Sequence, residues 1–212
     1  MPVTAKICGL STPETLDVAI RGGASHVGFV FFPPSPRTLS RERAAQLAAR
    51  VPGHVTRVGV FVDPDDMLLE ASIGAGQLQA LQLHNTSPIR AAAIKARTGL
   101  AIWAAVAVKT RADLAAAATY AGAADRILYD AKTPPGATLP GGMGVRFDWT
   151  LLQGFRHPLP WALSGGLDPL NLEEAVAVTG ATMVDVSSGV ESAPGIKDVT
   201  KIAAFLDTVK TL

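Results

Sequence analysis

A single thiol and a carboxylic acid each stand at the end of a short apolar run, where they could transfer protons. Cys8 ends the run "VTAKIC" and Asp130 ends the run "DRILYD". A thiolate can act as a base and a carboxylic acid can donate a proton, provided that the surroundings adjust their pKa values. A lone cysteine is more often inert packing, so Cys8 taken alone favours a structural role. Its chemistry depends on what the fold brings beside it.

Two turns rich in glycine and serine could hold an anion. They are "LSGGLDP" (163–169) and "VSSGVE" (186–191). Glycine lets the main chain approach a ligand closely, and free backbone N–H groups can bind a phosphate. Either turn alone would be explained by ordinary turn chemistry. The candidate ligand-binding residues in them are Gly165, Gly166, Ser187, Ser188 and Gly189.

Short apolar runs alternate with Ala-rich amphipathic stretches along the whole chain, and these elements must position the reactive groups. The runs predict strands at 3–8, 26–31, 55–62, 78–84, 100–108, 125–130, 161–164 and 182–187. The stretches between them predict helices at 13–22, 40–51, 64–73, 87–97, 111–121, 148–153, 169–179 and 198–210. Thr12-Pro13 and Asp168-Pro169 each have the form of an N-cap followed by proline at the first helical position.

Eight strands, each followed by a helix, predict an α/β fold: one (β/α)8 TIM barrel spanning residues 1–212. The competing arrangement is an open doubly wound sheet, which more often carries GxGxxG after its first strand, where this chain has "CGLSTPET". Barrel active sites lie at the C-terminal ends of the strands, often with a phosphate site after strands 7 and 8. That rule gathers Cys8, Arg37, His84, Asp130, Ser164 and both turns on one rim.

Composition excludes several kinds of partner. The 212 residues carry 19 basic and 18 acidic side chains with no basic stripe, so we expect no nucleic-acid partner. One cysteine cannot form an intramolecular disulfide, and four scattered histidines without a zinc pattern indicate no metal site. The N-terminus lacks the apolar core of a signal peptide, and every apolar run is too short for a bilayer. We therefore expect a cytoplasmic protein that does not enter the membrane.

Eight segments, in order and over nearly the whole chain, together resemble the phosphoribosylanthranilate isomerase family of tryptophan biosynthesis. No single segment is specific for this family, but the combination of all eight in this order is. The segments are "KICGL", "VGFVFFPPSPRTLS", "RVGVFVD", "LQLH", "DAKTPPG", "GGMGVRFDW", "LSGGLDPLN" and "VDVSSGVESAPGIKD".

The resemblance implies an aldose–ketose type isomerase that converts N-(5-phosphoribosyl)anthranilate to 1-(2-carboxyphenylamino)-1-deoxyribulose 5-phosphate, an Amadori rearrangement without metal or organic cofactor. It implies that Cys8 is the general base, that Asp130 is the general acid and that Arg37 contacts the anthranilate carboxylate. The two glycine turns would hold the substrate phosphate. The chain departs from the family at Met143, where Ser or Thr is usual. A monomer and a homodimer both remain open.

The rearrangement needs one proton delivered to the ring oxygen and one removed from C2′. An ordinary aspartic acid is ionised at pH 7, so a partly apolar pocket must raise the pKa of Asp130. A free thiol is mostly protonated, so the pKa of Cys8 must be lowered.

Some roles and readings stay open at this point. His84 could bind substrate or only pack, and Asp185 could bind substrate or lie buried beneath the rim. Lys6 shares a strand face with Cys8, so we expect it to be buried and paired with Asp185 on the neighbouring last strand. Alternative functions are another phosphosugar isomerase or epimerase, or a catalytically silent phosphate-binding barrel.

Overall fold

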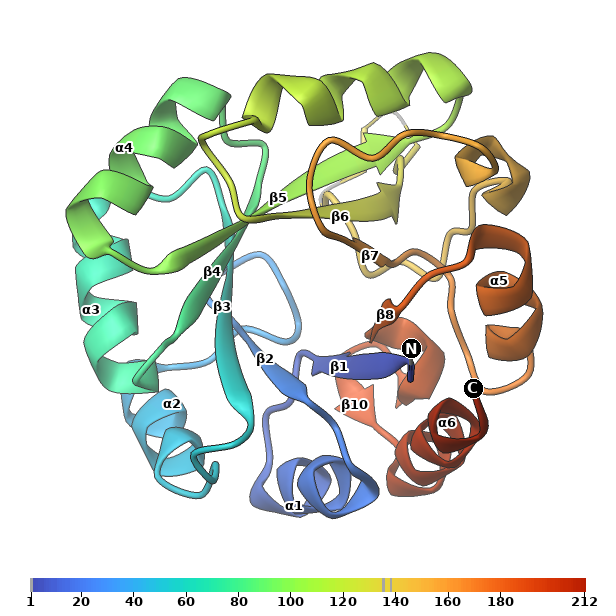
Figure 1. The fold of residues 1–212 in the computed structure, drawn as a ribbon. Coiled ribbons are helices and arrows are strands. Elements are labelled where there is room, and N and C mark those ends of the chain that lie inside the picture. Colours follow the sequence, from blue (N-terminus) through green and yellow to red (C-terminus); the bar gives the residue numbers. More distant parts are fainter. Residues whose placement is uncertain (1, 135, 138) are drawn as a thin grey trace.

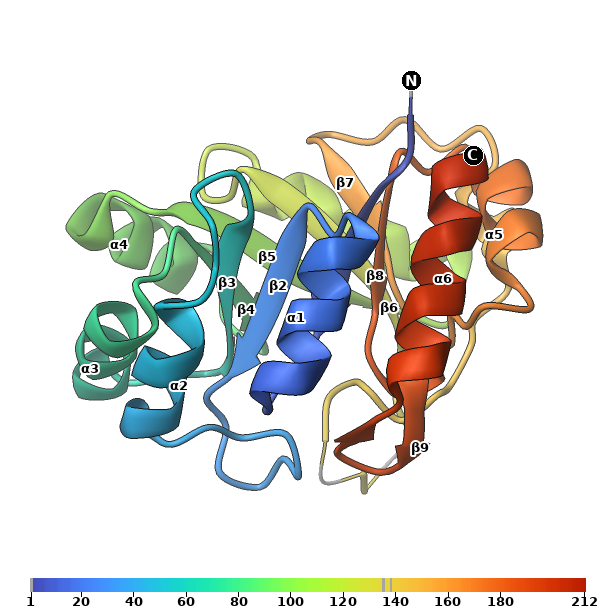
Figure 2. The same cartoon turned by 90° about the horizontal axis from the view of Figure 1, so that it is seen from below.

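Eight parallel strands close into a barrel in which β8 pairs with β1. The computed structural model describes residues 2–134, 136–137 and 139–212. Figure 1 shows the helices arranged around the ring of strands, and Figure 2 shows the same barrel from the side. The strands are β1 (Thr4–Cys8), β2 (His26–Val30), β3 (Thr56–Val62), β4 (Ala80–His84), β5 (Ala101–Val108), β6 (Arg126–Ala131), β7 (Trp161–Leu163) and β8 (Met183–Val186). The closed barrel confirms the predicted fold class and excludes the open sheet.

The outer layer contains α-helices and two 3₁₀ helices. The Thr12 side chain accepts a hydrogen bond from the Thr15 N–H, which confirms the predicted N-cap before Pro13. The segment after β5 is a 3₁₀ helix whose buried residues Leu114 and Ala117 are three apart, matching its three-residue turn. Among the described residues, the helices are all too short or too polar to cross a bilayer. The helices are α1 (Pro13–Gly22), α2 (Arg41–Ala48), α3 (Asp66–Gly76), α4 (Pro88–Thr98), η1 (Arg111–Tyr120), η2 (Trp149–Leu152), α5 (Leu172–Thr179) and α6 (Val199–Thr211).

The helix predicted at 169–179 begins later than expected. It starts at Leu172, and Asn171 rather than Asp168 occupies the N-cap position. Asp168 Oδ1 instead accepts hydrogen bonds from the N–H groups of Leu170 (2.7 Å) and Asn171 (3.0 Å). An Asp side chain that binds the main chain just after itself stabilises a turn, so the Asp168-Pro169 pair marks a turn and not a helix start.

A short β-hairpin between β8 and α6 was not predicted from the sequence. Its strands are β9 (Glu191–Ala193) and β10 (Ile196–Lys197), which pair antiparallel after the 3₁₀ turn η3 (Ser188–Val190). Strands of three and two residues give no detectable period, which explains the omission. The hairpin lies at the N-terminal end of α6 (Figure 2), and its register sets Lys197 opposite Glu191.

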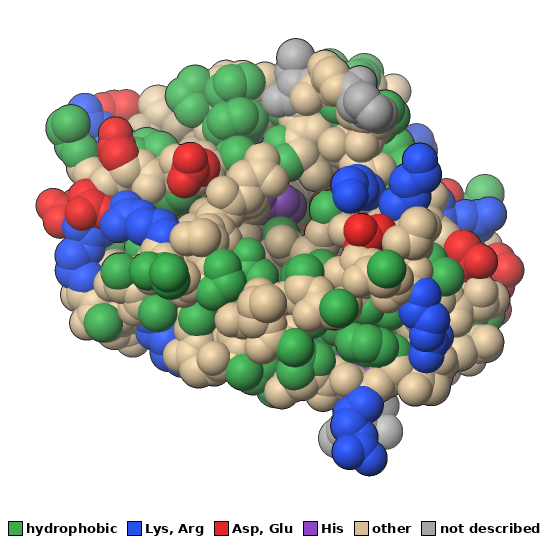
Figure 3. Space-filling view, turned by 90° about the horizontal axis from the view of Figure 1, so that it is seen from above, with side chains coloured by type: hydrophobic (Ala, Val, Ile, Leu, Met, Phe, Trp, Pro, Cys, Tyr) green, Lys and Arg blue, Asp and Glu red, His purple; other side chains and the backbone are tan. Residues whose placement is uncertain are grey.

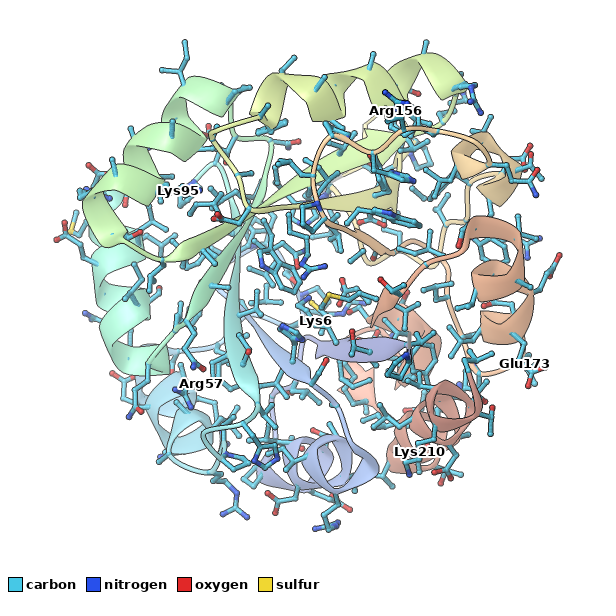
Figure 4. The ribbon with its side chains drawn as sticks, viewed as in Figure 1. Lys6, Arg57, Lys95, Arg156, Glu173 and Lys210 are labelled. Carbon is cyan, nitrogen blue, oxygen red and sulfur yellow. The ribbon has the colours of Figure 1, made fainter. Side chains whose placement is uncertain are left out.

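Most of the core lies between the barrel and its helices, and a smaller cluster fills the barrel itself. The cluster inside the barrel contains Val58, Ala80, Trp103, Leu128, Ala162 and Met183. Lys6 lies within the ring of strands in Figure 4, unlike Glu173 and Lys210, which lie at the periphery. The Lys6 side chain is fully buried, and its Nζ lies 2.8 Å from Asp185 Oδ1. The predicted pairing of Lys6 with Asp185 is therefore confirmed.

Gly28 on β2 leaves the space that the Lys6 and Cys8 side chains occupy. A Cβ at this position would lie 3.0 Å from Cys8 Sγ and 3.1 Å from Lys6 Cε. Glycine inside a strand often marks such a close approach. The barrel interior therefore accommodates a lysine and a thiol next to each other because the adjacent strand has no side chain there.

We expect Lys6→Met to lower the free energy of unfolding by about 3–5 kcal/mol, because it leaves the Asp185 carboxylate buried without its partner. The double variant Lys6→Met/Asp185→Leu removes both charges and should recover most of that loss. Urea denaturation with an unchanged m-value measures both effects. A loss below about 1 kcal/mol in the single variant would contradict a stabilising role for the pair.

Candidate active site

A cavity opens at the C-terminal ends of the barrel strands. The space-filling view shows a hollow with histidine atoms, in purple, visible inside it (Figure 3). The structure thus brings together nearly all the residues that the sequence singled out; Gly189 is the exception. Those that line the cavity are Cys8, Arg37, His84, Asp130, Ser164, Gly165, Gly166, Asp185, Ser187 and Ser188.

Cys8 ends β1 and reaches the cavity from beside the buried lysine. The residue is only 6% exposed. Burial raises the pKa of the Cys8 thiol, although the positive charges of Lys6 and Lys197 oppose that effect. The expectation of a lowered thiol pKa was therefore wrong for the unliganded protein, because loss of water outweighs the neighbouring cations.

Asp130 lies in β6 and faces the same cavity as Cys8. Burial, and then the negative charge of Asp185, raise the pKa of Asp130 to about 7. This confirms the expected direction. Its Oδ1 accepts one hydrogen bond from the Ala131 N–H at 2.9 Å, and a Cβ on Gly141 would overlap Oδ2. The glycine in the loop after β6 therefore lets the main chain lie directly against this carboxyl group.

His84 and Gln82 form a buried polar pair on β4. Burial lowers the pKa of His84 to about 4, assisted by the charge of Lys6, so the ring is neutral at pH 7. Its Nε2 lies 2.9 Å from Gln82 Nε2, and Gln82 Oε1 has no hydrogen-bond partner among the described residues. Gln82 was missed by the sequence reasoning. Its position two residues before His84 places it on the same strand face and could have revealed it.

Arg37 is buried and already engaged, unlike the solvated loop cation that its surroundings "PPSPRTLS" would suggest. Its Nε donates to Glu191 Oε1 at 2.7 Å, and its Nη2 donates to Glu191 Oε2 at 2.8 Å. The Nη2 group also donates to the Gly142 carbonyl at 2.8 Å. Lys197 Nζ donates to Glu191 Oε1 at 2.6 Å. Glu191 and Lys197 were not found from the sequence, since the hairpin that carries them was not predicted.

The turns after β7 and β8 line the cavity and contain backbone N–H groups without a partner in the described part of the chain. Gly165 and Gly166 have φ values of 86° and 68°, which glycine adopts readily. Within the described residues, the N–H groups of Gly165, Gly166, Ser188 and Gly189 have no hydrogen-bond partner. Gly189 packs against the Leu167 carbonyl, where a Cβ would overlap it, and does not line the cavity. Gly189 thus differs from the other three in its access to a ligand.

Ser187 ties the end of β8 to β1 and to the hairpin. Its Oγ donates to the Cys8 carbonyl at 3.3 Å. Lys197 Nζ donates to the Ser187 carbonyl at 2.9 Å and to its Oγ at 3.2 Å. The side chain of Ser187 is therefore bound within the protein, although the residue also lines the cavity.

A thiol, a carboxyl group of raised pKa and two glycine-containing turns thus line one cavity at the C-terminal ends of the strands. A family model described as N-(5'-phosphoribosyl)anthranilate (PRA) isomerase matches residues 5–208 of the chain. The chain belongs to the phosphoribosylanthranilate isomerase family. It is accordingly an isomerase of tryptophan biosynthesis, built on a TIM barrel.

Relatives of this family match the chain over its full length. It is 54% identical to the N-(5'-phosphoribosyl)anthranilate isomerase of Zymomonas mobilis subsp. mobilis, covering 100% of both chains. It is similar to the crystal structure of phosphoribosyl anthranilate isomerase from Thermotoga maritima, with a TM-score of 0.87, 38% identity and coverage of 99% and 100%. Another family structure, in complex with reduced 1-(o-carboxyphenylamino)-1-deoxyribulose 5-phosphate, has a TM-score of 0.84, 34% identity and the same coverage.

We expect Asp130→Asn to stabilise the protein at high pH. The native carboxyl keeps its proton up to about pH 7, whereas the unfolded chain releases it near pH 4, so native stability falls between these values. The amide removes that loss and should raise the free energy of unfolding by about 1–4 kcal/mol at pH 8, with little change below pH 4. Urea denaturation at both pH values measures the difference.

Asp148→Asn is the matched control for this effect. Hydrogen bonds from Thr150 hold the pKa of this exposed carboxyl below its usual range. Its replacement should therefore give no gain at pH 8. A similar gain in both variants would show that the stabilisation does not come from the environment of Asp130.

Proposed function

We propose that this isomerase converts N-(5-phosphoribosyl)anthranilate to 1-(2-carboxyphenylamino)-1-deoxyribulose 5-phosphate, with Asp130 as general acid and Cys8 as general base. The observation that carries the proposal is the placement of these two groups on one cavity, from β6 and β1, with a pKa of about 7 for Asp130. The reduced product analogue bound to a relative supports the choice of substrate.

Asp130 delivers the first proton, to the furanose ring oxygen. About half of the Asp130 side chains are protonated at pH 7, because burial favours the neutral acid. Protonation of the ring oxygen lets the C1′–O bond break, and the nitrogen lone pair forms the C1′=N bond of an iminium. The positive charges of Lys6 and of the iminium then favour the carboxylate that is left on Asp130.

Cys8 removes the second proton, from C2′. The electrons of that C–H bond form the C1′–C2′ double bond of an enolamine, and the iminium nitrogen is neutralised. The enolamine then tautomerises to the ketose. Burial raises the pKa of the Cys8 thiol, so the thiol is mostly protonated at pH 7. The positive charges of Lys6 and Lys197 favour the thiolate, so they increase the small fraction of Cys8 that can act as the base.

Substrate binding uses groups on either side of the proton carriers. Arg37 contacts the anthranilate carboxylate, because charge-assisted hydrogen bonds to a guanidinium suit a carboxylate. The unpartnered N–H groups of Gly165, Gly166 and Ser188 receive the phosphate. The neutral ring of His84, which lines the cavity, offers polar contacts for the sugar hydroxyls.

Replacing either proton carrier should lower kcat far more than it changes KM. We expect Cys8→Ala, Cys8→Ser and Asp130→Asn each to lose at least about 100-fold in kcat, with KM within about threefold. Serine fails because its hydroxyl yields almost no oxyanion at pH 7. Steady-state turnover of N-(5-phosphoribosyl)anthranilate by folded variants measures both constants. Cys8→Ser within tenfold of the original kcat would mean that Cys8 is packing.

The pH dependence should show which group titrates first. The active form has Asp130 protonated and Cys8 ionised, so kcat/KM rises up to about pH 7, stays level, and falls above the thiol pKa. In Asp130→Asn the change of slope near pH 7 should disappear, and the remaining kcat/KM should keep rising with pH until the Cys8 thiol is ionised. A descending limb near pH 7 in the original protein would indicate that Cys8 ionises before Asp130 and would contradict this assignment.

A further inference from the structure

Glu191, on the hairpin strand β9, is the centre of a buried charge cluster next to the cavity. Its carboxylate accepts four hydrogen bonds: two from Arg37, one from Lys197 Nζ and one from the Gly195 N–H at 3.1 Å. The Glu191, Arg37 and Lys197 side chains are all less than one-tenth exposed. A carboxylate so fully engaged has a fixed orientation, and it fixes the orientation of the groups that bind it.

The charges of the cluster do not balance within it. Arg37 and Lys197 carry two positive charges against the one negative charge of Glu191. Burial alone would raise the pKa of Glu191, but the hydrogen bonds from Arg37 and the charge of Lys197 hold it below its usual value. The carboxylate therefore stays ionised at neutral pH. A buried cluster with one excess positive charge beside a cavity favours an anion in that cavity.

The hydrogen bonds also determine which edge of Arg37 remains available. Its Nε and Nη2 are occupied by Glu191 and by the Gly142 carbonyl. Within the residues that the structure describes, Nη1 donates no hydrogen bond, and it lies 3.0 Å from the position that a Cβ of Gly142 would take. Arg37 itself lines the cavity. An incoming anion must therefore bind through Nη1, and Glu191 decides where that donor points.

We propose that Glu191 is a positioning residue that holds Arg37 with Nη1 presented to the carboxylate on the aromatic ring of the substrate, and so sets the selectivity for that carboxylate. The inference rests on the proposed function, which assigns the ring carboxylate to Arg37. The β9–β10 hairpin is then part of the specificity apparatus, not only a connection from β8 to α6. A purely structural Glu191 would affect stability without affecting the choice between ligands.

The test compares two inhibitors by calorimetry: the reduced product analogue, and the same molecule with phenyl in place of 2-carboxyphenyl. The original protein should bind the carboxylated inhibitor about 10- to 100-fold more tightly, as expected for a charge-assisted contact. Glu191→Gln should lose most of that preference while binding the phenyl inhibitor within about threefold of the original affinity. It should also raise KM much more than it lowers kcat.

Lys201→Met is the matched control. Lys201 Nζ donates to the Glu191 main-chain carbonyl at 2.7 Å, so this change disturbs the same hairpin without touching the carboxylate. It should keep the full preference for the carboxylated inhibitor. If Glu191→Gln does not fold, Glu191→Asp keeps the charge but withdraws it by one methylene, and it should lose part of the preference.

The outcomes separate the two proposals. If the original protein does not distinguish the inhibitors, the assignment of the ring carboxylate to Arg37 fails. If it distinguishes them and Glu191→Gln or Glu191→Asp does so equally well, the positioning role of Glu191 is overturned. An equal loss of affinity for both inhibitors, or the same loss of preference in Lys201→Met, would assign Glu191 to the support of the hairpin and would also overturn it.

Discussion

The ion pair of Lys6 with Asp185 inside the barrel is the interaction on which the electrostatics of the site depend. Both side chains are buried, and Nζ lies 2.8 Å from Oδ1. The positive charge of Lys6 favours the thiolate of Cys8 and the neutral form of His84, and the negative charge of Asp185 favours the protonated form of Asp130; at Cys8 and at Asp130 the other partner of the pair acts in the opposite direction. This pair, of which Asp185 itself lines the cavity, thus acts on three other groups that line it, and the low dielectric around the pair strengthens each effect.

Burial acts in the same direction on both proposed proton carriers, yet it suits them unequally. It favours the neutral acid of Asp130, which is the form that a proton donor needs, and the neutral thiol of Cys8, which is not the form that a base needs. Only Cys8 therefore depends on nearby cations to recover its reactive form. Lys6, two residues before Cys8, supplies such a cation, and Gly28 leaves room for both side chains.

The two buried ion clusters of the site differ in charge and in consequence. Lys6 with Asp185 is balanced and lies within the barrel, where it stabilises the fold only while both partners are present. Glu191 with Arg37 and Lys197 has one excess positive charge and lies where the hairpin meets the loops after β2 and β6. The Gly142 carbonyl connects that cluster to the loop that also covers Asp130 through Gly141. The loop after β6 therefore contacts both Arg37 and Asp130.

The sequence alone determined the barrel, the strand ends and the presence of Cys8, Asp130 and the two glycine turns on one rim, because these depend on local patterns and on chain order. Strand alternation and the adjacency of the first and last strands were also enough to pair Lys6 with Asp185. The tertiary structure alone decided the direction of the Cys8 pKa, since burial comes from residues far apart in the chain. It alone joined Arg37 to Glu191, 154 positions away, through a hairpin too short to leave a pattern. Desolvation and long-range contacts are properties of the assembled fold, and no local window of sequence contains them.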